Sequence, residues 1–239
     1  EAALIYERLT ARYPNAPDIE QAHAGLILAY AESARIAKSV LAAKRLPRTS
    51  DPTGVLAPAL TQAAIKAQEK KNTASSLELV DLALQHSPSA ELRETLLLLQ
   101  ANAFFSQGSY AEVRTTAESY LQVYPQGRYA EDATYLKVMA GLLLGPATRS
   151  LEEIQDYLAR FPDGRFVADA RYRWAAAEFS VGNYAKARER TELWIATFPD
   201  DHPQRAEVFS LQGDILAAAG EAESAIASYE SALLSPLAD

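Results

Sequence analysis

PDGRFVADARYRWAAAEFSVGNYAKARERTELWIATFP, residues 162–199, is one complete unit of an internal repeat that decides the fold. The unit before it begins in the same way. GRY at 127–129 returns as GRF at 164–166, and Asp132-Ala133 returns as Asp169-Ala170, each after a step of 37 residues. Self-similarity at a fixed period of this length is typical of a repeat solenoid rather than of a globular enzyme.

Two amphipathic helices are predicted within this unit, because apolar residues recur at helical spacing, stop at Gly182 and then resume. Gly182 can adopt the left-handed backbone conformation that ends a helix. Gly108, Gly145 and Gly220 lie at or within one residue of the same place in their units. Pro199 ends the second helix, because proline lacks the amide that the next turn would need.

Small residues occupy two further places in the repeat. Seven residues before the turn glycine stand Ala101, Val138, Ala175 and Gly213, and five residues after it stand Val113, Ser150, Ala187 and Ala225. We expect the two antiparallel helices to approach each other closely at these places. One helix pair cannot bury its apolar face alone, so we expect each pair to be stabilised by its neighbours.

The sequence therefore predicts an all-α fold of the α-α superhelix class, with about six helix pairs and an unpaired N-terminal helix. We expect one domain over residues 1–239, with repeat junctions near residues 14, 51, 88, 125, 162, 199 and 236. Helices are predicted at 1–13, 16–33, 35–46, 59–71, 74–86, 90–107, 109–123, 128–144, 150–160, 165–181, 184–197, 203–218 and 221–234. The unpaired first helix suggests a fragment of a longer protein.

Two details of this prediction concern irregular places. Ser150 with Glu153 three residues later forms a capping-box pattern, which predicts that the helix after Pro146 begins at about residue 150. Residues 45–58 break the period and contain three prolines, of which Pro58 suits the first turn of a helix. This segment is either a solvated connection or a loop that binds a partner.

The repeat units resemble a known family. GNYAKA at 182–187, and the last unit with Gly220, Ala225, Tyr229, Ala232 and Pro236, resemble the second-helix signature of the tetratricopeptide repeat (TPR). YPQGRYAEDATY at 124–135 and FPDGRFVADARY at 161–172 are similar to repeats of bacterial periplasmic TPR proteins of the BamD and CpoB/YbgF kind. The resemblance implies a protein-binding solenoid in the periplasm or cell envelope, with the cytoplasm as the alternative.

Composition excludes several classes of function. The chain has no cysteine for a disulfide or thiolate site, and no apolar run reaches the roughly 18 residues of a membrane helix. Its formal net charge of −8 is uneven, because residues 1–75 carry +3 and the remainder −11. An acidic C-terminal half would repel phosphate backbones and anionic lipids, so we expect neither nucleic acid binding nor direct membrane insertion.

The sequence offers little for catalysis. Three histidines are scattered along the chain, and only His202, after Asp200-Asp201, suggests a metal site. Aspartate before a helix is ordinary capping, and no phosphate-binding loop or metalloprotease motif is present. We therefore predict a protein that is not an enzyme and has no catalytic residue, metal or cofactor.

The first helices of the pairs are expected to line a concave surface that binds partners. The inward positions lie 13, 10, 6 and 3 residues before each turn glycine. The candidate partner-binding residues at these positions are Leu98, Asn102, Phe105, Asp132, Tyr135, Met139, Asp169, Tyr172, Phe179 and Asp214. Aromatic rings beside carboxylates suit a peptide with apolar and Lys/Arg anchors, although Tyr135 and Tyr172 could equally pack between neighbouring helices.

Three functions fit these observations. The leading hypothesis is a scaffold that binds proteins or peptides on its concave surface, in bacterial envelope assembly. The first alternative is a regulatory or substrate-presenting arm of a larger cell-wall or polysaccharide enzyme. The second is a structural array that self-associates. The sequence does not specify the partner or the oligomeric state.

Overall fold

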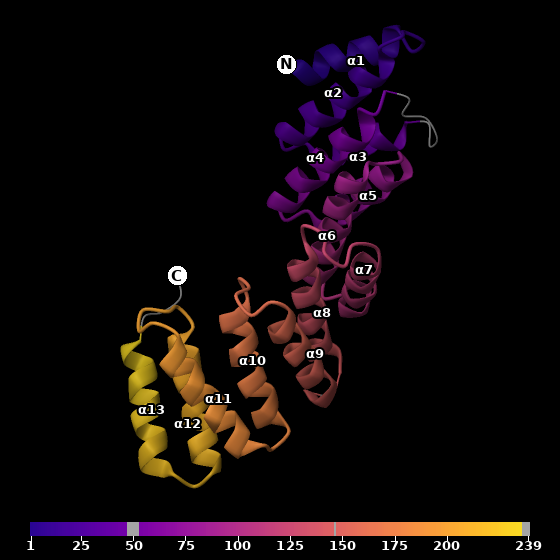
Figure 1. The fold of residues 1–239 in the computed structure, drawn as a ribbon. Coiled ribbons are helices and arrows are strands. Elements are labelled where there is room, and N and C mark those ends of the chain that lie inside the picture. The colour runs from indigo at the N-terminus through magenta and orange to yellow at the C-terminus, as the bar shows by residue number, and fades with distance from the viewer. Residues whose placement is uncertain (47–52, 146, 236–239) are drawn as a thin grey trace. The chain divides into compact units, whose positions relative to one another are not determined.

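The chain is all-α, as predicted. A computed structural model describes residues 1–46, 53–145 and 147–235, and within these ranges it contains thirteen helices and no strand (Figure 1). The helices are α1 (Ala2–Arg12), α2 (Ile19–Glu32), α3 (Ile36–Lys44), α4 (Leu56–Glu69), α5 (Thr73–Gln85), α6 (Ala90–Ser106), α7 (Tyr110–Val123), α8 (Ala130–Leu144), α9 (Ala147–Arg160), α10 (Val167–Ser180), α11 (Tyr184–Thr197), α12 (Arg205–Ala218) and α13 (Ala222–Leu234).

Two compact units make up the chain, Glu1–Ala140 and Gly141–Asp239, and the boundary between them falls within α8. In the first unit, α2, α4 and α6 contact one another in succession, while α3 and α5 form a second layer (Figure 1). In the second unit, α9 to α13 each contact the next helix, and α10 also contacts α12. A single domain over the whole chain stays a prediction.

Each unit has an apolar core between its layers. In the first unit, Ile27, Leu60 and Leu79 have no exposed surface and belong to one cluster that extends from α1 to α6. In the second, buried Ala175 and Ala187 pack with Leu211 and Ile215. The predicted small residues Ala101, Val113, Ala175, Ala187, Gly213 and Ala225 are all buried.

The turn inside a helix pair has the same backbone form in five places. Gly108, Gly182 and Gly220 have φ of 75°, 81° and 82°, and at the equivalent positions Ala34 and Lys71 have φ of 58° and 56°. The amide of the residue that follows this left-handed residue donates to the carbonyl five residues before it, as from Asn183 N to Glu178 O at 2.9 Å. This is the Schellman motif, which satisfies the last carbonyls of the first helix. The predicted break near Ser33-Ala34 is therefore correct.

Gly145 is an exception to the predicted turn. It is not among the glycines with positive φ, and its amide donates to Gly141 O at 3.1 Å, as in a continuing helix. The prediction that Gly145 forms the same left-handed turn as Gly182 is therefore wrong.

The capping box predicted at Ser150 is also wrong. Helix α9 begins at Ala147, and Ser150 lies inside it with its hydroxyl buried and unpaired among the described residues. Ser39 and Ser76 stand at the same place in their units, and their hydroxyls donate to Ile27 O at 2.9 Å and Ala64 O at 3.0 Å. A serine at this place lies within the helix pair, so it is not available to cap a helix.

Large aromatic residues anchor the junction between successive pairs, a feature that the sequence analysis missed. Tyr120, Tyr157 and Trp194 recur at the 37-residue step and are almost wholly buried. Two of them bond to the backbone just before the next first helix: Tyr129 N donates to Tyr120 Oη at 2.9 Å, and Phe166 N donates to Tyr157 Oη at 3.2 Å. Trp194 Nε1 instead donates to Ala168 O of the preceding helix α10 at 2.8 Å, and its ring lies 5.0 Å from that of His202 in the junction to α12. Through Tyr120 and Tyr157, the second helix thereby fixes where the following pair begins.

We predict that Gly182→Ala lowers the free energy of unfolding by about 1 kcal/mol, because alanine is disfavoured at positive φ. The cost is conformational, since a Cβ at Gly182 meets nothing within 4 Å. Urea unfolding gives the measurement. Gly145→Ala is the matched control and should cause no loss, because its Cβ would lie 3.8 Å from Gly141 O. Equal effects of the two substitutions would contradict the turn geometry.

Tyr120→Phe removes a hydroxyl that donates one hydrogen bond and accepts another, while the ring stays in place. We expect the free energy of unfolding of the first unit to fall by about 1 to 3 kcal/mol, because both partners of the hydroxyl lose a hydrogen bond. That hydroxyl donates to Glu94 Oε2 at 2.8 Å. Burial raises the pKa of Tyr120 most, and this hydrogen bond raises it further. Thermal unfolding compares this variant with Tyr124→Phe, because the Tyr124 ring, just after the end of α7, lies 5.5 Å from that of Tyr120. If both variants melt alike, the hydroxyl does not anchor the junction.

Candidate functional site

The face formed by α10 and α12 brings together the four candidate residues of the second unit. Asp169, Tyr172 and Phe179 lie on α10 and are half-buried, whereas Asp214 lies on α12 and is exposed. The other inward positions of α12, Glu207, Ser210 and Ala217, are exposed as well. Because α10 contacts α12, these side chains form one surface, which we call the α10–α12 face.

The aromatic residues of this face are partly built into the core. Tyr172, Ala176 and Phe179 pack against the buried cluster of Ala175, Ala187, Leu211 and Ile215. The ring of Phe179 also lies 5.6 Å from that of Tyr184 at the start of α11. Each aromatic side chain therefore has one part that stabilises the helix packing and another that remains accessible.

Three carboxylates of this face act on the pKa of Tyr172. Burial raises the pKa of Tyr172 most, and the charge of Glu207 raises it further, with smaller contributions from Asp169 and Asp214. Arg173 acts in the opposite direction. The α10–α12 face thus combines apolar rings with negative potential, as a partner with basic and apolar groups would require.

The two predicted aspartates of this face differ in the ion pairs and hydrogen bonds that they already form within the chain. Asp169 forms an ion pair with Arg173 at 2.5 Å and accepts from Gln204 Nε2 at 2.6 Å. Asp214 accepts from Tyr229 Oη at 2.8 Å and keeps its carboxylate exposed. Asp214 and Glu207 are consequently the more accessible acids, and Asp169 mainly fixes α10 to the start of α12.

In the first unit, the predicted residues lie on two helices. Leu98, Asn102 and Phe105 share one side of α6, Asp132, Tyr135 and Met139 share one side of α8, and all six are half-buried. Asn102 Nδ2 donates to Leu98 O at 3.0 Å, and the ring of Phe105 lies 5.6 Å from that of Tyr110. These contacts lie within the repeat unit itself, so partner binding by these six residues stays a prediction.

Sequence reasoning missed a groove between α2 and α4 of about 570 Å³. Its lining residues are small, apolar or amide-bearing: Gln21, Ala24, Gly25, Leu28, Gly54, Val55, Pro58, Ala59 and Gln62. Gln21, Ala24 and Leu28 stand 13, 10 and 6 residues before Ala34, so the position rule could have found them. It did not, because the turn residues Ala34 and Lys71 are not glycines.

Part of the irregular segment 45–58 contributes to this groove. Gly54, Val55 and Pro58 line it, and the Thr53 hydroxyl donates to Glu20 Oε2 at 2.5 Å. Pro58 lies in the first turn of α4, as expected. Residues 47–52 of the segment lie outside the described residues, so the structure does not decide between a solvated connection and a binding loop.

Metal binding at His202 is not supported by its surroundings. The His202 ring lies 5.0 Å from Trp194 and 5.4 Å from Phe198, and its Nδ1 accepts from Gln204 N at 3.2 Å. Across the part of the chain that the structure describes, no group of three or more His, Cys, Asp or Glu side chains could hold a metal ion. Nor is any described helix long and apolar enough to cross a membrane.

The fold is that of tetratricopeptide repeat proteins, as solved structures show. No protein-family model matches the sequence, and no curated protein matches it. MamA (residues 41 to the end) from Desulfovibrio magneticus RS-1 aligns with a TM-score of 0.64 at 15% identity, covering 76% of this chain and 95% of that one.

Two further structures share this fold. YrrB, described as a TPR protein with an unusual peptide-binding site, aligns with a TM-score of 0.56 at 18% identity, over 74% of this chain and 84% of its own. A Podospora anserina putative kinesin light chain with TPR-like repeats aligns with a TM-score of 0.60 at 15% sequence identity. The alignment covers 74% of this chain and 92% of that one. At these identities the similarity extends to the fold alone.

We predict that Tyr172→Ala lowers the free energy of unfolding by about 1 to 3 kcal/mol, because part of a large ring leaves the core. Urea unfolding measures the loss. Ser210→Ala, on the exposed row of α12, is the control and should change little. If Tyr172→Ala is as stable as Ser210→Ala, the Tyr172 ring does not contribute to the stability of the core.

Proposed function

We propose that this chain is a scaffold that binds a protein or peptide through the face of its first helices. TPR-like solenoids present extended surfaces of this kind to their partners. In the second unit the binding surface is the α10–α12 face, with Tyr172 and Phe179 as apolar contacts. The single observation that carries the proposal is the combination of these half-exposed rings with the exposed carboxylates of Glu207 and Asp214.

The charge of this face selects the partner chemistry. A basic side chain of the partner would interact with Glu207 or Asp214, while an apolar side chain would cover Tyr172 or Phe179. Rim charges of this type mainly raise the association rate and the specificity, so binding should weaken with salt. We therefore propose a partner segment that carries Lys or Arg together with apolar residues.

We further propose that the protein acts in the bacterial cell envelope, in the periplasm. The support is the similarity of 124–135 and 161–172 to repeats of the BamD and CpoB/YbgF kind. Fractionation of the native cells with detection of the protein would test this location. Recovery in the cytoplasmic fraction would overturn the proposed location without affecting the peptide-binding proposal.

The binding test uses two synthetic peptides of 15 residues that alternate Leu with Lys or Leu with Glu. Amide chemical shifts of the whole chain are followed by NMR during titration at low salt. The Lys peptide should bind at least about ten-fold more tightly than the Glu peptide, a difference of about 1.4 kcal/mol. Its shifts should concentrate on α10 and α12.

A pair of double variants supplies the control. Glu207→Gln with Asp214→Asn should reduce affinity for the Lys peptide by about ten-fold. Glu223→Gln with Glu230→Gln removes two exposed carboxylates from α13 and should leave affinity nearly unchanged. Equal losses in the two double variants would indicate a general charge effect and contradict the proposed face.

A further inference from the structure

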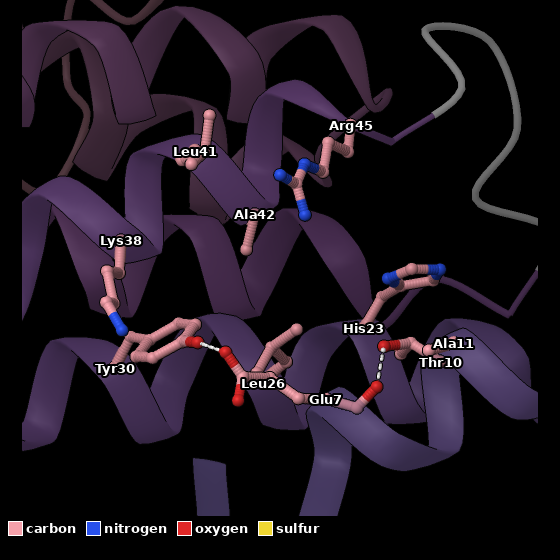
Figure 2. Close-up of a pocket in the computed structure, with 10 residues that line it drawn as sticks. All are labelled: Glu7, Thr10, Ala11, His23, Leu26, Tyr30, Lys38, Leu41, Ala42 and Arg45. Carbon is pink, nitrogen blue, oxygen red and sulfur yellow. Dashed lines mark hydrogen bonds between the residues drawn. The ribbon is translucent and has the colours of Figure 1, made fainter. Parts of the chain in front are cut away.

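A cavity of about 540 Å³ lies in the first unit, among α1, α2 and α3 (Figure 2). Helix α2 contributes its floor, α1 and α3 contact α2 from either side, and α1 and α3 do not contact each other. In the neighbouring part of this layer, α3 and α5 do make contact. The cavity therefore lies where two second helices remain apart, on a surface that differs from the α2–α4 groove.

The cavity has an apolar interior. Leu26 of α2 and Ala42 of α3 are more than nine-tenths buried, and Leu41 and Ala11 contribute exposed apolar surface at the rim. Pockets of roughly 300 to 1,000 Å³ with mainly apolar walls and a few polar groups are typical of small-molecule sites. Both the volume and the lining of this cavity fall within that description.

The acidic residue of the cavity is already engaged. The Tyr30 hydroxyl donates to the Glu7 carboxylate, and this bond raises the pKa of Tyr30 more than burial does. Lys38 Nζ lies 5.5 Å from the centre of the Tyr30 ring. At this end of the cavity, the negative charge of Glu7 and the positive charge of Lys38 therefore lie around the same tyrosine.

The other end of the cavity carries a cation, Arg45, that has no anionic partner among the residues that the structure describes. The guanidinium of Arg45 points from the end of α3 toward the middle of the cavity, and His23 faces it from α2 (Figure 2). No ion pair joins Arg45 to any residue within the described ranges. Burial lowers the pKa of His23, so this imidazole is neutral at pH 7 and can donate or accept one hydrogen bond.

We propose that this cavity binds a small amphipathic carboxylate. Its apolar body would lie on Leu26 and Ala42, and its carboxylate would pair with Arg45, with His23 as a neutral hydrogen-bonding neighbour. A guanidinium presents paired donors that match both oxygens of a carboxylate. An organic cation is disfavoured, because the lining carries two cations, Lys38 and Arg45, against the one carboxylate of Glu7.

Octanoate is the probe for this site, and octanol and octylammonium are matched ligands of the same chain length. Each is titrated into the whole chain and followed by NMR. Octanoate should saturate a single site whose shifts concentrate on α1, α2 and α3, with at least about ten-fold higher affinity than octanol, or about 1.4 kcal/mol. Equal binding of octanoate and octanol, or no saturable octanoate binding, would overturn the proposal.

Variants separate the cavity from a general effect of charge. Arg45→Gln should lower octanoate affinity by about ten-fold while leaving octanol binding unchanged. Arg8→Gln is the control, because Arg8 is an exposed cation of α1 outside the cavity lining. If Arg8→Gln weakens octanoate as much as Arg45→Gln does, binding does not depend on this cavity and the proposal fails. The α10–α12 face is unaffected by either result.

Discussion

The left-handed residue between the two helices of a pair is the constraint on which the rest of the structure depends. It reverses the chain within a few residues, and the hydrogen bond that follows, such as Asn183 N to Glu178 O, closes the first helix. Once the reversal is fixed, small buried residues on both helices permit close packing. The aromatic anchors Tyr120 and Tyr157 then bond to the start of the next pair, while Trp194 bonds to the first helix of its own pair.

Much of this architecture could be predicted from the sequence, because glycine and proline have conformational requirements that depend little on tertiary contacts. The period, the helix pairs and the close approach at Ala175 and Ala187 follow from such local signals. The turns at Ala34 and Lys71 show the limit, since packing there imposes positive φ on residues that rarely adopt it. Ser150 shows the same limit, because a cap and a buried contact use the same residue type.

The candidate sites were less predictable than the fold. Projection onto the repeat identified the rings and acids of the α10–α12 face, but it could not show that Asp169 is held by Arg173 and Gln204. The cavity among α1, α2 and α3 had no sequence signal, because it depends on the separation of two helices. Its charge also depends on Arg45, which forms no ion pair with the described residues, and the order of residues along the chain does not reveal such pairing.

The central claim is that each helix pair is stable only through contact with its neighbours. Native-state hydrogen exchange of the backbone amides tests it most directly, since protection reports the free energy of local opening. Amides of α4 and α5, which have neighbours on both sides, should exchange more slowly than those of α1 and α13. Equal protection of α1, α4, α5 and α13 would show that stability does not arise from stacking and would contradict this account.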